Sequence, residues 1–378
     1  MQDAPLLTRV EVMTSRRLLI LIVVAIVAVG AGVWLAGRQS SSGSTSGTDM
    51  LYPELKGQLN AVNAVHIYKA GDARVVELKK QGESWAVSER DDYPADESKV
   101  RKLLIAIADA KVYEEKTSNP ASYATLGVED TKGAGATSLR IELVGTPKPV
   151  NLIVGKQGAG ARSNYVRRAG EPQSWLINAA IDTSATPEAW LRKDIIDVSA
   201  DRMQSAKVET KGAKPYTAAK GTRADTDFAV EGLPKGKSLS APSAANTVAT
   251  ALTGLSLADV RAASAFQSTP PAAKATFKTF DGLTVEMDGW VQEEKHYVAL
   301  RPSFDGAQAE RFKVATAPAE EKKTEEQKDD KAQEPPKPAA PNAEEDAKKL
   351  AAKTNGWVYE IPDYKYESLF KPADQLVK

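Results

Sequence analysis

The longest run of uncharged, mostly apolar residues in this chain spans the nineteen positions 18–36, directly after Arg16 and Arg17. At about 1.5 Å rise per residue, a helix of this length just spans a hydrocarbon core of roughly 30 Å. Because the arginines precede the run, the positive-inside rule predicts a cytoplasmic tail over 1–17 and an extracytoplasmic remainder, anchored in the cytoplasmic membrane by one span. A cleaved signal peptide is the alternative, but its best small-x-small site, at 28–30, lies inside the run.

Small side chains recur every four residues within this run. Ala28, Gly32 and Ala36 share one face of the predicted helix. Small residues at this spacing let two transmembrane backbones approach closely, so they predict a contact with a helix of a membrane protein. Such residues are also common in membrane helices without any partner, and this alternative stays open.

Beyond the apolar run, short strand-like segments dominate. Residues 37–50 are rich in Ser and Gly and predict a flexible linker. Residues 97–110 place apolar side chains every three or four positions after a capping Asp96, which predicts an amphipathic helix. Alternating or short apolar runs split by Gly and Pro predict antiparallel strands. These runs cover 64–68, 74–79, 85–89, 111–115, 138–144, 150–155, 164–168 and 174–178.

The same order of elements returns in the second half, where residues 243–255 take the place of the first helix and Trp357 that of Trp175. An internal duplication explains this order economically. The predicted fold class is therefore α+β: one N-terminal transmembrane helix, then two similar lobes over 51–190 and 191–378. Each lobe is predicted to hold an antiparallel sheet and one main helix. Two α+β segments can also resemble each other by pattern alone.

A charged stretch over 317–350 interrupts the second lobe. It contains ten acidic residues, seven lysines and five prolines, and no aromatic residue. Such a composition cannot bury enough apolar surface to offset the entropy lost on ordering. We therefore predict that this stretch is a disordered insertion.

Composition and charge argue against several functions. Lysine plus arginine and aspartate plus glutamate balance at 50 each, so no basic field is available for binding nucleic acid. The chain has no cysteine, which excludes disulfides and thiolate metal sites. His66 and His296, the only histidines, lie in strand patterns without the spacing of a catalytic or metal site. We predict no enzymatic activity and no cofactor.

One segment is similar to a known family. Residues 115–130 contain the pattern Lys-Thr-x-Asn-Pro, then Tyr, then Leu-Gly, and 51–55, 85–87, 93–96 and 165–167 add further matches in order. Together they resemble the uncharacterised bacterial family called domain of unknown function 4340. The signature residues are Lys116, Thr117, Asn119, Pro120, Tyr123, Leu126 and Gly127. Locally they predict a turn, a short helix and a glycine stop, serving either as a structural clasp or as a contact surface.

The resemblance implies a membrane-anchored protein often encoded beside an ABC-type permease, its ATPase and a gliding-motility-like auxiliary subunit. It supplies no catalytic residues. The sequence thus favours a non-enzymatic, membrane-anchored, extracytoplasmic accessory subunit of an ABC-type transport complex. Its expected partners are the lipid bilayer and a permease or auxiliary subunit. The alternative is an extracytoplasmic ligand-binding or sensing module for a glycan, lipid or peptide, which would use a cleft between the lobes.

Overall fold

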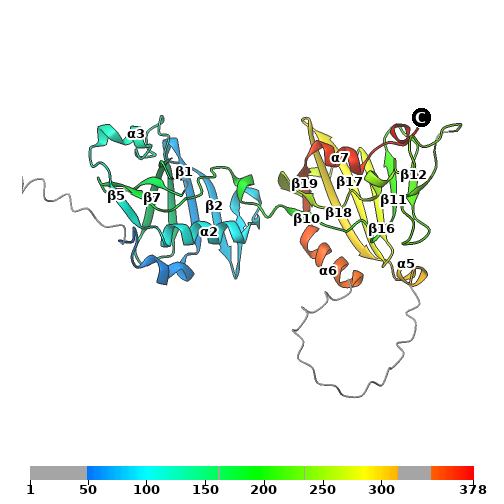
Figure 1. Cartoon of the computed structure of the whole chain (residues 1–378), viewed down its shortest axis with the longest axis horizontal. Coiled ribbons are helices and arrows are strands. Elements are labelled where there is room, and N and C mark those ends of the chain that lie inside the picture. Colours follow the sequence, from blue (N-terminus) through cyan, green and yellow to red (C-terminus); the bar gives the residue numbers. More distant parts are fainter. Residues whose placement is uncertain (1–48, 161, 234, 314–341) are drawn as a thin grey trace, which may run out of the picture.

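The computed structural model describes residues 49–160, 162–233, 235–313 and 342–378. Within these ranges, two β-sheet lobes lie side by side, the first coloured blue to green and the second green to red (Figure 1). No helix in the described part of the chain has the length and apolar character needed to cross a membrane. The transmembrane helix in our predicted fold class is therefore withdrawn. Its residues, 18–36 with Ala28, Gly32 and Ala36, lie outside the described ranges.

The first lobe is built on a nine-stranded sheet whose neighbouring strands are all antiparallel. Its strands are β1 (Ala64–Lys69), β2 (Ala73–Gln81), β3 (Ser84–Val87), β4 (Tyr93–Pro94), β5 (Val112–Glu115), β6 (Leu139–Val144), β7 (Val150–Gln157), β8 (Asn164–Arg168) and β9 (Ser174–Ile177). Their order across the sheet is β4-β3-β2-β1-β6-β7-β8-β9-β5.

Helix α2 (Glu97–Ala108) covers the apolar face of this sheet. It begins at Asp96, whose carboxylate accepts a hydrogen bond from the backbone N–H of Lys99 at 3.0 Å. Its apolar stripe, which includes Val100 and Ile107, is buried against the sheet. The strands supply alternate positions such as Val65 and Ile67 of β1, since successive side chains of a strand point to opposite faces.

The second lobe is an eight-stranded sheet, also antiparallel between neighbours. Its strands are β11 (Met203–Thr210), β12 (Tyr216–Ala219), β13 (Ala229–Glu231), β15 (Asp259–Ala262), β16 (Ala273–Thr279), β17 (Leu283–Gln292), β18 (Lys295–Phe304) and β19 (Trp357–Ile361). The order β13-β12-β11-β16-β17-β18-β19-β15 repeats the first sheet from β3 to β5, strand for strand. The lobes therefore share one topology, and β4 is the extra strand of the first.

The predicted α+β class is wrong, because the described chain is mostly antiparallel sheet with few helices. The helix predicted over 243–255 is reduced to α4 (Asn246–Ala249). Threonines interrupt this stretch, and the hydroxyl of Thr250 donates to the carbonyl of Asn246 at 2.8 Å. Gly254 follows with a φ of +59°, and the chain then enters a strand. The remaining α-helices in the described ranges are α3 (Tyr123–Leu126), α5 (Gly306–Arg311), α6 (Ala343–Thr354) and α7 (Asp363–Leu369).

Helix α6 includes positions 343–350, which we predicted to be disordered. The side chain of Asn342 accepts a hydrogen bond from the backbone N–H of Glu345 at 3.4 Å and so caps the helix. Ala343 and Ala347 are buried in the core, and the helix packs against β18. Glu344, Glu345, Lys348 and Lys349 are exposed, whereas Asp346 is partly buried and pairs with Arg202 at 2.9 Å.

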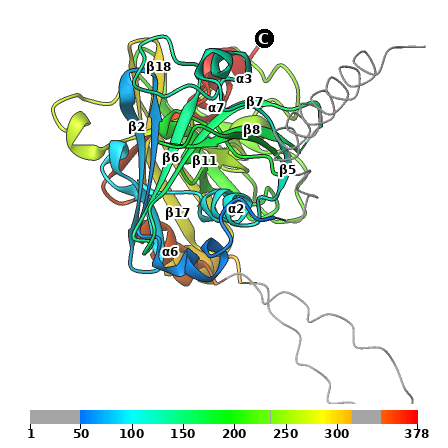
Figure 2. The ribbon, with the colours of Figure 1, turned by 90° about the vertical axis from the view of Figure 1, so that its left-hand side faces the viewer.

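The two sheets meet edge to edge. The short strand β4 of the first lobe faces β15 and β19 of the second, while β10 (Asp194–Ile196) and β14 (Leu255–Ser256) form a separate two-stranded sheet between them. Buried apolar residues of both lobes form one continuous core cluster. Viewed along the long axis, the lobes lie one behind the other (Figure 2). The free edges, β5 and β13, are at opposite ends of the body (Figure 1).

Candidate functional site

The family-signature loop connects β5 to α3 at the end of the first lobe away from the second (Figure 1). Thr117 holds it to the sheet: its backbone N–H donates to the hydroxyl of Ser174 at 3.1 Å, and its carbonyl accepts from the Ser174 N–H at 2.9 Å. Asn119 then caps the short turn that begins at Pro120, with its side chain accepting from the N–H of Ala121 at 3.1 Å. The signature polar residues thus fix a corner of the chain.

Tyr123 holds the same loop through its hydroxyl and its ring. Its hydroxyl donates to the carbonyl of Pro172 at 2.5 Å, and the guanidinium of Arg167 lies 4.5 Å from its ring centroid. Arg167 is 3% exposed and donates to the carbonyl of Val128 and to Asp130, both at 2.8 Å. A buried arginine with this many acceptors has a structural role, because its donors are already used in hydrogen bonds within the lobe.

The glycine stop works as predicted from its residue type. Gly127 has a φ of +69°, a conformation that side chains disfavour, and it ends α3. The ammonium of Lys156 donates to the carbonyl of Thr125 at 2.9 Å, beside this end. Leu126 packs on the Tyr123 cluster, and Lys116 pairs with Glu114 at 2.7 Å. These contacts describe a clasp within the first lobe.

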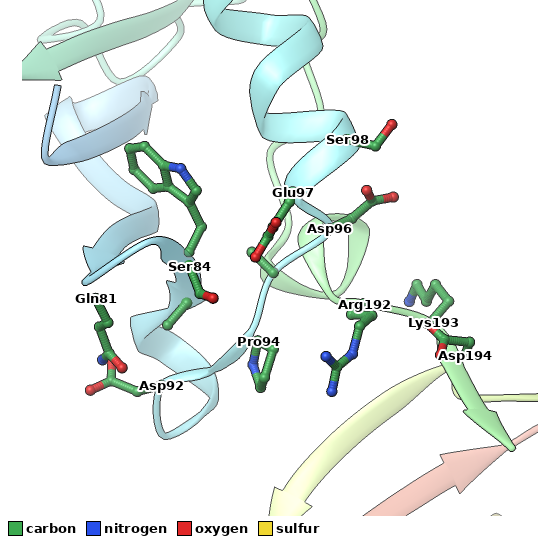
Figure 3. A pocket seen from close by; sticks show the side chains of 13 residues that line it. Gln81, Ser84, Asp92, Pro94, Asp96, Glu97, Ser98, Arg192, Lys193 and Asp194 are labelled. Atoms are coloured by element: carbon green, nitrogen blue, oxygen red, sulfur yellow. The ribbon is translucent and has the colours of Figure 1, made fainter. Parts of the chain in front are cut away.

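A second feature is a hollow of about 630 Å³ beside the joint between the lobes. Three separate segments enclose it: the β2–β3 hairpin, the stretch from Asp92 to the first turn of α2, and the connector at 192–194. In Figure 3, Gln81 and Ser84 lie on one side and Arg192, Lys193 and Asp194 on the other, with Pro94 and Glu97 between them. This is the size range of small-molecule sites.

The charged groups around the hollow differ in their hydrogen-bond and ion-pair partners. Lys193 donates to the carbonyl of Ala258 at 2.9 Å, and burial lowers the pKa of its ammonium. Asp194 forms an ion pair with Lys353, and Asp96 caps α2. In contrast, the Nε of Arg192 is buried and has no hydrogen-bond partner among the described residues. Because this atom has almost no exposed surface, a ligand in the hollow would not contact it.

The joint itself combines an ion-pair cluster with aromatic packing. Arg90 donates from Nε and Nη2 to the two carboxylate oxygens of Asp259 at 2.6 and 3.1 Å, and it also contacts Glu188. Tyr93 is fully buried, and its ring centroid lies 5.0 Å from that of Trp357 in an edge-to-face arrangement. Tyr359 packs on the same ring at 6.2 Å. The first lobe is thereby locked onto the edge of the second.

Comparison with known proteins identifies the family. The model of the family described as Domain of unknown function (DUF4340) matches residues 85–279, just over half of the 378 residues. The chain belongs to this family. The match begins in β3, includes the signature loop and the connector, and ends in β16, so it takes in parts of both lobes. This confirms the family predicted from residues 115–130. No curated protein and no solved structure matches the chain.

The two histidines of this DUF4340 protein each meet carboxylates. His66 lies on β1 directly between Glu77 of β2 and Glu142 of β6, with its Nδ1 3.1 Å from Glu142 Oε2. Tyr68 donates to the same oxygen at 2.9 Å. Burial raises the pKa of Glu142, but hydrogen bonds from His66 and Tyr68 outweigh it and hold this pKa below its ordinary value. No group of three His, Asp or Glu side chains in the described ranges is arranged to hold a metal ion.

Sequence reasoning missed the residues of the joint and of the hollow. In the sequence, Tyr93 and Pro94 count only as part of the family match over 93–96, and no pattern there indicates that Tyr93 packs against the second lobe. Arg90 and Arg192 carry no motif. Asp259, the acceptor of Arg90, is 169 residues away in the chain, and Tyr93, which donates to the Arg192 carbonyl, is 99 residues from Arg192. Only the folded arrangement brings these residues together.

Proposed function

We propose that this DUF4340 protein is a non-enzymatic accessory subunit of an ABC-type transport complex. It acts outside the cytoplasm, at the cytoplasmic membrane, and contacts a permease or an auxiliary subunit. Family membership supports this proposal, because the resemblance implies genes encoded beside an ABC-type permease and its ATPase.

The observation that carries the proposal is the locked joint between the lobes. Proteins that close around a ligand need a joint with few contacts, where a hinge absorbs the motion. Here Arg90 binds Asp259 across the joint, and Tyr93 is buried against Trp357. One continuous core also runs through both lobes. A stiff body of this kind is suited to hold partner surfaces at a fixed separation.

A polar sheet face offers a surface for such a partner. On the first sheet it carries His66, Glu142 and Arg140, which are linked through Tyr68 and Asp72. These side chains remain partly exposed. Interfaces between proteins that associate reversibly are more polar than permanent interfaces, and this sheet face is polar.

The test is co-purification from membranes of the bacterium that encodes the protein. A tagged chain is extracted in mild detergent, and the permease is sought by mass spectrometry. The proposal predicts recovery of the permease with the unaltered chain and with Tyr93→Phe, but reduced recovery with Tyr93→Ala, which loosens the joint. If the permease is missing even with the unaltered chain, the proposal fails.

A further inference from the structure

The hollow beside the joint is surrounded by unused hydrogen-bonding groups. The side chains of Gln81, Ser84, Asp92 and Glu97 line it; all four residues are exposed to solvent, and these side chains form no hydrogen bond or ion pair with a residue in the described ranges. The guanidinium-bearing residue Arg192 also borders the hollow. Carboxylates, an amide, a hydroxyl and an arginine therefore surround it.

The wall between these groups is apolar. Trp85, Ala86, Pro94 and Ala95 all border the hollow, and Ala86 and Ala95 are buried in the first lobe. A volume of about 630 Å³ with an apolar wall and a few converging polar groups has the anatomy of a small-molecule site. A compound that fits must cover carbon surface and also satisfy both donors and acceptors.

The charges around the hollow select the class of compound. Asp92 and Glu97 oppose an anion, although Arg192 and the start of α2 would attract one. Arg192 and Lys193 oppose a cation in the same way. A neutral hydroxyl group avoids both penalties, because it donates to a carboxylate and accepts from a guanidinium.

We infer that this hollow is a binding site for a neutral, hydroxyl-rich ligand, namely a saccharide. Glu97 and Asp92 accept from ligand hydroxyls, Arg192 donates to a ligand oxygen, and the apolar wall covers the sugar ring. The site lies in the first lobe and the connector, so binding requires no motion between the lobes. It goes beyond the proposed accessory role and does not depend on it.

The experiment titrates the full-length chain, shown to be folded by circular dichroism, with maltose, cellobiose and N,N′-diacetylchitobiose. Isothermal titration calorimetry is expected to show saturable binding of at least one disaccharide, with a Kd of about 1 mM or lower. Arg192→Met and Glu97→Gln should each weaken binding about tenfold, since the first removes a charged donor and the second replaces a charged acceptor by a neutral one.

A matched control is Glu231→Gln, which changes the same kind of side chain on the exposed strand β13. It should bind the disaccharide as the unaltered chain does. Inorganic phosphate is titrated in parallel. Saturable phosphate binding lost in Arg192→Met, or failure of all three disaccharides to bind, would overturn the inference. Equal binding by the Glu97→Gln and Glu231→Gln variants would place any sugar site elsewhere.

Discussion

Replacing Tyr93 by alanine should uncouple the two lobes. The ring is fully buried at the joint, and it packs edge to face on Trp357 at 5.0 Å and on Tyr359 at 6.2 Å. Truncating a buried aromatic residue costs about 3–5 kcal/mol, and each aromatic pair adds about 0.5–1.5 kcal/mol. We therefore expect Tyr93→Ala to lower the free energy of unfolding by at least about 3 kcal/mol.

Tyr93→Phe is the matched control. It keeps the ring and removes only the hydroxyl, which donates to the carbonyl of Arg192 over a long 3.4 Å. Its cost should stay below about 1.5 kcal/mol, the upper end for an ordinary hydrogen bond. Urea denaturation measures both variants, and calorimetry should show one transition for the unaltered chain and two for Tyr93→Ala. Equal losses in the two variants would refute the argument that the aromatic packing holds the joint.

Three further outcomes follow from local contacts. Gly289→Ala should destabilise by about 1–3 kcal/mol in urea denaturation, because its Cβ would lie 2.7 Å from Phe370, whereas Gly57→Ala meets no atom within 4 Å and should be neutral. Tyr123→Phe should speed hydrogen exchange in the signature loop, unlike Tyr364→Phe, where the ring is 64% exposed. The pKa of Glu142 is lower in the folded chain than in the unfolded chain, where it is about 4.3. Ionised Glu142 therefore stabilises the fold above about pH 4.3, and this stabilisation is lost as the pH falls through the pKa of the folded chain. Glu142→Gln should therefore show a smaller drop in melting temperature between neutral and acidic pH.

Period-two patterns located many of the strands from the sequence. Residues 164–168 were predicted as a strand and form β8 with the same bounds. Residues 64–68 lie within β1. These predictions succeeded because one face of each sheet is buried, which forces apolar residues into alternate positions. The family assignment from residues 115–130 succeeded for a different reason, since the signature residues interlock locally.

The helices were harder to predict because burial and conformation are separate properties. Val248, Leu252 and Leu255 are all buried, as their helical spacing indicated, yet Leu252 lies in a turn and Leu255 in β14. In 343–350 the overall composition concealed a helix. There, Glu344 and Lys348 form an ion pair at 2.7 Å with the i,i+4 spacing of a helix. Average composition over a long charged stretch cannot show that part of it is a capped helix.

The candidate binding hollow lay beyond sequence reasoning. Its walls come from the hairpin at Gln81–Ser84, the stretch after Asp92 and the connector at Arg192. None of these segments carries a motif, and the register of β3 with β4 sets how they face one another. The signature loop, in contrast, draws its main partners from 116–174 of one lobe, so it left a recognisable pattern.

The repeated topology also explains why the two lobes differ at their edges. Strands β5 and β15 occupy equivalent positions, but Asp259 of β15 is neutralised by Arg90 of the first lobe. On β5, residues 49–51 cover only the beginning: the N–H of Val112 donates to the carbonyl of Asp49 at 2.8 Å. The rest of β5 presents Glu114 and Glu115 without a facing strand in the described chain. Carboxylates on an open edge oppose the addition of another strand. The strand position that meets the other lobe in β15 is therefore an open, charged edge in β5.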